Sequence, residues 1–251
     1  MVKKYQEKRD RHLDETFNNR WFQRFLVTLF LGGQVLLRIV TGKIDRRKIM
    51  EHLVTVGLDS LRSVLLIAFF AGMIFTVQSA RELIRYGAVG AVGGAFAVAF
   101  CRELAPVLTA GVVAGQVGSA FAAEIGEMQV TEQIDALYML RTNPVDYLVV
   151  PRVIACCVML PILTIFSVAV GILGGLFVAV YFYELEPSVF LESVRTFLGP
   201  WDLVTVAIKS FIFGLIIALV GCGWGLTTAG GGKGVGQAAT AAVVTSWVFI
   251  F

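Results

Sequence analysis

The stretch GAVGAVGGAFAVAFCRELAPVLTAGVVAGQVGSAFAA, residues 87–123, decides the fold. It is 37 residues long, and its only charges are the pair Arg102-Glu103, with Pro106 close behind. As one helix it would cover about 55 Å, nearly twice the hydrocarbon thickness of roughly 30 Å. We therefore expect a membrane span over about 95–123, and a re-entrant or surface piece over 87–94 on the far side.

Composition extends this interpretation to the whole chain. Hydrophobic residues make up 57% and charged residues 16% of the 251 residues, and the mean hydropathy is +0.79. Soluble domains are about 45–50% apolar and about 25% charged. We predict an all-α integral membrane protein with about five spans. Besides 95–123, these cover about 63–77, 148–183, 203–228 and a last apolar segment that ends at Phe251.

The last segment is short. Counted from Gln237 it would span only about 22 Å, so the helix must start earlier or lie in a thinned bilayer.

The first 62 residues differ from the rest of the chain. Twelve of the 21 Lys and Arg residues precede Glu51, and residues 20–40 combine aromatic and basic positions at helical spacing. This pattern is typical of an amphipathic helix at the membrane interface. We predict a basic cytoplasmic tail with interfacial helices over 1–62 and a transmembrane domain over 63–251, with the N-terminus in the cytoplasm. Nucleic acid is a poor alternative partner, because no aromatic-interleaved binding motif accompanies the charges.

Catalytic, metal and cofactor sites are not expected. Both histidines, His12 and His52, precede the first span, so no Ser–His dyad can form in the membrane. No cluster of aspartates lies in an apolar segment to hold a metal. The glycine run beginning at Gly230 fails the G-x-x-x-x-G-K-[ST] spacing of a phosphate-binding loop, so ATP would be used by another polypeptide. The four cysteines lie in apolar runs and are expected to be buried and unpaired.

Three charged residues inside apolar segments are candidates for a substrate cavity. Arg102 and Glu103 are adjacent, and Lys209 lies in the fourth expected span. A charge near the bilayer centre is costly unless it is paired or hydrated. The three side chains could line a hydrated cavity for a polar headgroup, or they could form an ion pair that only sets helix register.

The region of about 124–147 is the long polar stretch between two spans. It has the pattern of an amphipathic helix over 124–140 whose outer face carries Glu124, Glu127, Glu132 and Asp135. Such a helix could be a solvated connection, or it could dock into a groove on a partner.

Glycines recur at the spacing of close helix packing, at 90/94, 111/115, 171/175 and 221/225. Small residues four apart let helices approach closely in lipid.

Several motifs resemble those of MlaE-type permeases, the membrane subunits of lipid-transporting ABC systems that work with MCE-domain proteins. They are RELAPVLT (102–109), AGQVGSA (114–120), AEIGEM (123–128), VTEQIDAL (130–137), Asn143-Pro144 and YLVVPR (147–152). Shorter matches are Lys209-Ser210, Phe213-Gly214, Gly234-Val235-Gly236 and Ala239-Thr240. The resemblance covers residues 53–251. It implies a homodimer of five-span subunits, two ATPase subunits that contact a coupling helix after Glu124, a lipid cavity between the protomers, and a ring of MCE domains outside.

The hypothesis is ATP-driven lipid transfer between a bacterial inner membrane and an external MCE-domain carrier. A plastid inner envelope is the second choice of membrane. The alternatives are an ATPase-independent carrier or channel, a membrane scaffold, and a membrane enzyme, which the missing catalytic sets disfavour.

Overall fold

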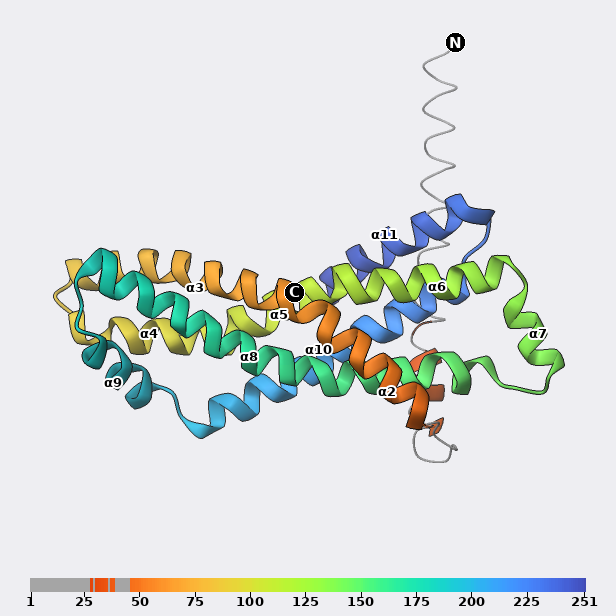
Figure 1. The fold of residues 1–251 in the computed structure, drawn as a ribbon, viewed down its shortest axis with the longest axis horizontal. Coiled ribbons are helices and arrows are strands. Elements are labelled where there is room, and N and C mark those ends of the chain that lie inside the picture. Colours follow the sequence, from red (N-terminus) through yellow and green to blue (C-terminus); the bar gives the residue numbers. More distant parts are fainter. Residues whose placement is uncertain (1–27, 29, 36, 39–45) are drawn as a thin grey trace, which may run out of the picture.

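The chain folds into an elongated bundle of helices in the computed structural model, which describes residues 28, 30–35, 37–38 and 46–251. Every regular element from residue 46 onward is helical. The long helices run side by side along the bundle, and α7 lies at the end opposite the short helix α9 (Figure 1). The prediction of an all-α protein is confirmed. The basic tail and most of the expected interfacial helix lie outside the described residues.

The α-helices are α2 (Arg46–Val54), α3 (Ser60–Arg85), α4 (Val92–Ala99), α5 (Ala105–Val113), α6 (Ser119–Val130), α7 (Gln133–Met139), α8 (Val150–Tyr183), α9 (Pro187–Phe197), α10 (Pro200–Leu226) and α11 (Gly231–Ile250). Wider π-helical turns join several of them: η1 (Thr55–Asp59), η3 (Phe100–Leu104), η4 (Ala114–Gly118) and η5 (Val145–Val149). A 3₁₀ turn, η2 (Val89–Ala91), precedes α4.

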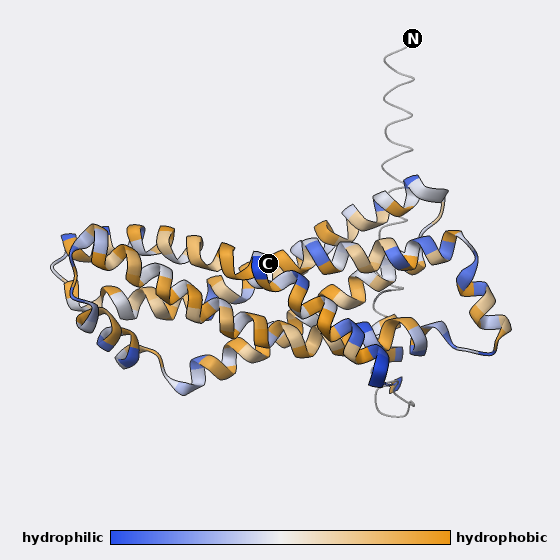
Figure 2. Cartoon of the chain, in the orientation of Figure 1, coloured by the Kyte–Doolittle hydropathy of each residue, from blue (hydrophilic) through white to orange (hydrophobic). Residues whose placement is uncertain are grey.

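Within the described residues, four helical runs are long and apolar enough to cross a membrane. They cover Arg46–Arg85, Val89–Val130, Val145–Tyr183 and Pro200–Leu226. Hydrophobic residues dominate the middle of the bundle, and hydrophilic residues gather at the end that holds α2 and α7 (Figure 2). Helix α11 is the expected last apolar segment. It begins at Gly231, before Gln237, and its 20 residues cover about 30 Å. Helix α11 is less apolar than the other four runs and is not among the candidate spans. The count of five spans therefore stays a prediction.

The expectation of a re-entrant piece over 87–94 is wrong, and the alternative of a surface piece stays a prediction. Gly87, with φ +74°, ends the run of α3, and from Val89 the chain is helical without a break through Val130. Helix α9 covers this segment: Gly93 and Gly94 meet Phe190 and Phe197 at close range. The partner helix explains the difference, because a helix satisfies its own backbone groups and can bury its apolar side chains against a neighbour.

The single amphipathic helix expected over 124–140 is also wrong. The transmembrane run continues through α6 to Val130, and the chain turns at Thr131-Glu132 before α7 begins at Gln133. Glu132 has the left-handed φ of 59°, a conformation that ends a helix. Glu124 and Glu127 therefore belong to the long helix, and α7 carries Asp135 alone of the four predicted acids.

Glycine contacts set the distance between α3 and α8. A Cβ added at Gly72 of α3 would lie 2.1 Å from the carbonyl oxygen of Gly171 on α8, and one at Gly171 would lie 2.1 Å from the ring of Phe100. Close approach is confirmed at six of the eight predicted glycines: 94, 111, 171, 175, 221 and 225. Gly90 and Gly115 have open space instead. The four cysteines are buried and free, as predicted.

Replacing Gly72 by Ala tests this packing. The added methyl group would press on the backbone of α8, and such overpacking costs roughly 1–3 kcal/mol. We expect a lower midpoint of thermal unfolding for the detergent-purified Gly72→Ala variant. Gly236→Ala is the matched control, because a Cβ there meets nothing within 4 Å. Equal midpoints for the two variants would show that α3 and α8 are not in backbone contact.

Candidate functional site: intramembrane ion pairs and the α7 end of the bundle

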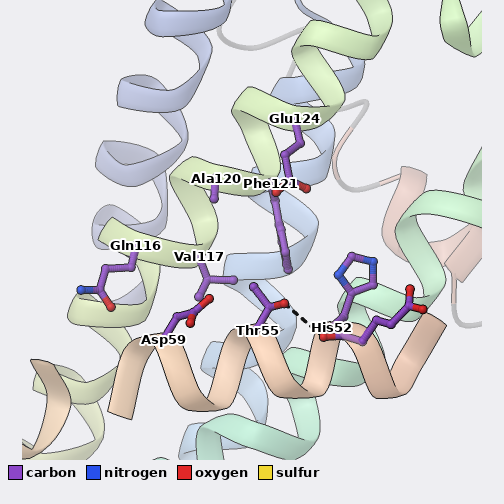
Figure 3. Close-up of a pocket in the computed structure, with 9 residues that line it drawn as sticks. His52, Thr55, Asp59, Gln116, Val117, Ala120, Phe121 and Glu124 are labelled. Carbon is purple, nitrogen blue, oxygen red and sulfur yellow. Dashed lines mark hydrogen bonds between the residues drawn. The ribbon is translucent and has the colours of Figure 1, made fainter. Parts of the chain in front are cut away.

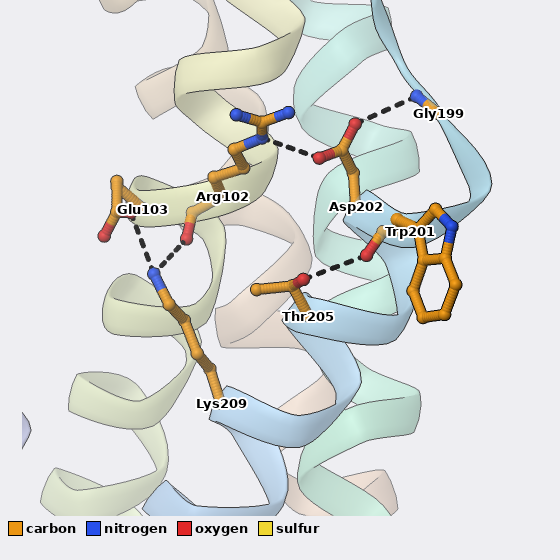
Figure 4. A network of polar contacts seen from close by, with 7 residues as sticks. All are labelled: Arg102, Glu103, Gly199, Trp201, Asp202, Thr205 and Lys209. Carbon is orange, nitrogen blue, oxygen red and sulfur yellow. Dashed lines mark hydrogen bonds and ion pairs between the residues drawn. The ribbon is translucent and has the colours of Figure 1, made fainter.

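Two ion pairs connect the turn η3 to α10. Arg102 donates from Nε to Asp202 Oδ1 at 2.6 Å, and Lys209 Nζ lies 2.8 Å from Glu103 Oε1. The backbone N–H of Gly199 donates to the other oxygen of Asp202 at 2.9 Å. Figure 4 shows the resulting network, which brings the three predicted cavity residues together and adds Asp202.

A proline explains why Lys209 reaches the backbone here. Pro106 has no N–H, so the carbonyl of Arg102 lacks its normal donor four residues on. Lys209 Nζ donates to this carbonyl oxygen at 2.9 Å. The chain widens into the π-helical turn η3 at the same residues, and such turns are frequent at functional sites.

The network lies level with the middle of an uncharged stretch of α3, which is where the centre of a bilayer is expected. On α3, residues 63–80 carry no charge, and Arg62 and Arg81 flank them. Gly72, near the middle of this stretch, contacts Gly171, which in turn contacts the ring of Phe100 beside Arg102. Charges at this depth are costly unless they are paired, and the two ion pairs meet that need.

A second polar region lies toward the end of the bundle that holds α7. A cavity of about 200 Å³ separates α2 and η1 from η4 and α6. Acidic and polar residues line both sides of the cavity, together with the ring of Phe121 (Figure 3). The lining residues are Glu51, His52, Thr55, Asp59, Gln116, Val117, Ala120, Phe121 and Glu124. Beside it, Gln116 donates to the hydroxyl of Ser63 at 2.8 Å.

Glu124 makes an ion pair with Arg152 of α8. Its Oε2 lies 2.7 Å from Arg152 Nη2, and the Arg152 side chain is only 7% exposed. Glu124 is itself exposed, with its side chain at 53%, as are Glu127 on α6, Glu132 on the turn and Asp135 on α7. Within the described residues, Glu124 is the one predicted coupling acid that has an ion-pair partner.

Sequence reasoning missed Asp202 and Arg152. Arg152 is the lone charge between Asp146 and Glu184, so the rule applied to Arg102 would also have selected it. Asp202 follows Gly199-Pro200 at the start of α10, and the sequence places it at the end of an acidic loop. Its pairing with Arg102 depends on how α9 returns the chain to the bundle, which no local pattern shows.

Long apolar helices with the length and composition of membrane spans define a multi-pass membrane protein. The model of the family described as "Permease MlaE" matches residues 49–251. The chain belongs to the MlaE permease family, whose members are permeases of ABC transporters.

Named relatives agree with this assignment. A probable ABC transporter permease protein of Synechocystis is 57% identical over 92% of this chain and 88% of its own length. The Arabidopsis thaliana chloroplastic protein TRIGALACTOSYLDIACYLGLYCEROL 1 is 46% identical over 93% of this chain and 67% of its own length. A probable ABC transporter permease protein of Rickettsia prowazekii is 40% identical over 80% and 78%.

A double-mutant cycle tests the second ion pair. Lys209→Met removes the cation and leaves the Glu103 carboxylate and the Arg102 carbonyl without their donor, so we expect its thermal midpoint to fall by several degrees. Glu103→Gln with Lys209→Met should lose less than the two single variants combined. Strictly additive losses, measured on detergent-purified protein, would mean that Glu103 and Lys209 do not interact.

Proposed function

We propose that this chain forms the membrane pathway for ATP-driven transfer of lipid between a bacterial inner membrane and an MCE-domain protein outside. The observation that carries the proposal is the charged network of η3 and α10, embedded at mid-depth in otherwise apolar helices. A lipid has the same combination of a polar group and apolar chains. The galactolipid in the name of the Arabidopsis relative supports a lipid substrate.

The exposure of the network supports a cavity completed by a second copy. The Glu103 side chain is 71% exposed and that of Arg102 51% exposed, although both are paired. Charged groups at this depth would not face hydrocarbon chains. A homodimer with these residues around a shared, hydrated space removes the conflict. Arg102, Glu103 and Lys209 would then contact the polar headgroup.

The end of the bundle around α7 suits an ATPase partner. Glu127, Glu132 and Asp135 provide acidic groups, and Tyr138, Met139 and Leu140 are 60%, 88% and 73% exposed. Apolar side chains ringed by charge are typical of a protein interface. The glycine run from Gly230 serves a structural purpose, because Gly230 and Gly231 adopt positive φ where α11 begins. We assign ATP binding and hydrolysis to a separate subunit, because the glycine run also fails the spacing of a phosphate-binding loop.

The charge distribution supports a cytoplasmic location for the α7 end. Arg46, Arg47 and Lys48 open α2 at the same end of the bundle, and basic residues beside a span favour the cytoplasm. The chloroplastic relative keeps the plastid envelope as the second choice of membrane.

Glu103→Ala tests the pathway directly. Loss of one charge-assisted contact to a headgroup corresponds to roughly a tenfold effect, so we expect ATP-dependent lipid transfer in proteoliposomes to fall by about that factor. The complex should still assemble. Glu82→Ala, an exposed acid near the end of α3, is the control. Unchanged transfer by Glu103→Ala would remove the cavity role of this residue.

Met139→Asp tests the partner surface. We expect the wild-type chain, purified from its host in mild detergent, to bring an ATPase subunit and an MCE-domain protein with it. A charge on the apolar part of α7 should lose the ATPase and keep the MCE-domain protein. Leu191→Asp, at the opposite end on α9, should keep the ATPase. A wild-type chain that reproducibly purifies alone would favour an ATPase-independent carrier.

A further inference from the structure

Arg152 is a buried cation whose charge is balanced by a single acid within the described residues. The residue is 6% exposed. Nη2 donates to Glu124 at 2.7 Å, and Nη1 donates to the carbonyl of Leu148 at 3.0 Å. A cation buried this deeply depends strongly on its partner. The ion pair is therefore a fixed point of this part of the structure.

This ion pair joins the two helices that lead to and from α7, and we call the place where they meet the neck. Glu124 and Arg152 are 28 residues apart in the sequence. Between them the chain leaves the bundle at the end of α6, forms α7, and returns through η5 into α8 (Figure 1). A force on α7 reaches the bundle through these two helix ends and through Ile134, which is 3% exposed and packs into the core.

The neck is also connected to α2. The centroid of the Phe121 ring lies 5.3 Å from the guanidinium carbon of Arg152. The same centroid lies 5.9 Å from the centroid of the His52 ring. Figure 3 shows Phe121 and His52 facing each other across the cavity. The ends of α2, α6 and α8 therefore meet at one cluster.

One helical run joins this cluster to the intramembrane charges. Glu124 and Glu103 both lie in the run Val89–Val130, about 32 Å apart at 1.5 Å per residue. The π-helical turns η3 and η4 lie in this run, and η3 contains Glu103 itself. A displacement at Glu124 has a continuous mechanical path to the candidate cavity.

We propose that the Glu124–Arg152 ion pair is a positioning lock that makes α6 and α8 move together when the partner acts on α7. Glu124 acts through Arg152 and does not contact the ATPase, whereas Glu127, Glu132 and Asp135 remain available for that contact. An ion pair suits this purpose because its directional hydrogen bonds fix the register of two helix ends. The inference rests on the proposed function and gives one of its residues a different task.

Coupling efficiency is the measurement that separates this lock from a merely structural contact. The complex purified with its ATPase is placed in liposomes, and ATP hydrolysis and lipid transfer are measured together. For Glu124→Gln and Arg152→Gln we expect hydrolysis to stay within about twofold of wild type while the lipid moved per ATP falls about tenfold. Exchanging the two residues, in Glu124→Arg with Arg152→Glu, should restore most of the ratio.

Glu82→Gln is the matched control, because it removes an acid without a described ion pair. A normal ratio in Glu124→Gln would overturn the lock. An exchange variant as uncoupled as the single variants would overturn it too, since the pairing would then not be the cause.

Hydrogen exchange on the chain alone tests the lock without the partner. Glu124→Gln should speed amide exchange over residues 124–130 and 145–152 and leave α4 and α9 unchanged. Glu124→Asp, which keeps the charge but shortens the reach, should give a smaller effect. Unchanged exchange in Glu124→Gln would refute the lock. A wild-type complex without ATP-dependent lipid transfer would refute the proposed function instead.

Discussion

A polar group inside the hydrocarbon layer has no water to bond to, and this constraint shapes the whole bundle. The carbonyl of Arg102, which Pro106 deprives of its helical donor, receives a bond from Lys209. The same ammonium group pairs with Glu103, and the neighbouring Arg102 pairs with Asp202. One proline in an apolar helix is thus accompanied by four charged residues from two segments. The charged groups that could recognise a headgroup lie where the helix backbone needed a hydrogen-bond donor.

The two ends of the molecule are connected by unusually long helices. Val89–Val130 and Val145–Tyr183 contain 42 and 39 residues, more than the roughly 20 that a bilayer requires. Each carries one half of the ion pair beside α7, and α10 joins the first at the deeper network. A permease that transmits movement from a separate ATPase subunit needs such stiff connections, because flexible loops would absorb the movement. Close glycine contacts between α3 and α8 add to this stiffness.

Much of this could be predicted from the sequence, because it follows from local chemistry. Hydropathy indicates a helical membrane protein, and the motifs from Arg102 to Arg152 indicate the family. The early start of α11 is one of the two outcomes that its length allowed, the other being a thinned bilayer. The errors concern features that depend on tertiary contacts. Helix continues through residues 92–94 because α9 covers it, and the break at Glu132 uses a left-handed conformation at a residue that is not glycine. Arg152 as the partner of Glu124 became visible only when α6 and α8 were placed together.

The ion pairs between η3 and α10 join residues 100 and 106 positions apart in the sequence. A substitution at Arg102 or Glu103 alone would leave a charged residue of α10 without its ion-pair partner. Over evolutionary time the two segments must therefore change in step or remain as they are. Exchanging one of them between relatives, as in a chimaeric gene, would keep the ion pairs only when the two parents carry matching charges at these positions.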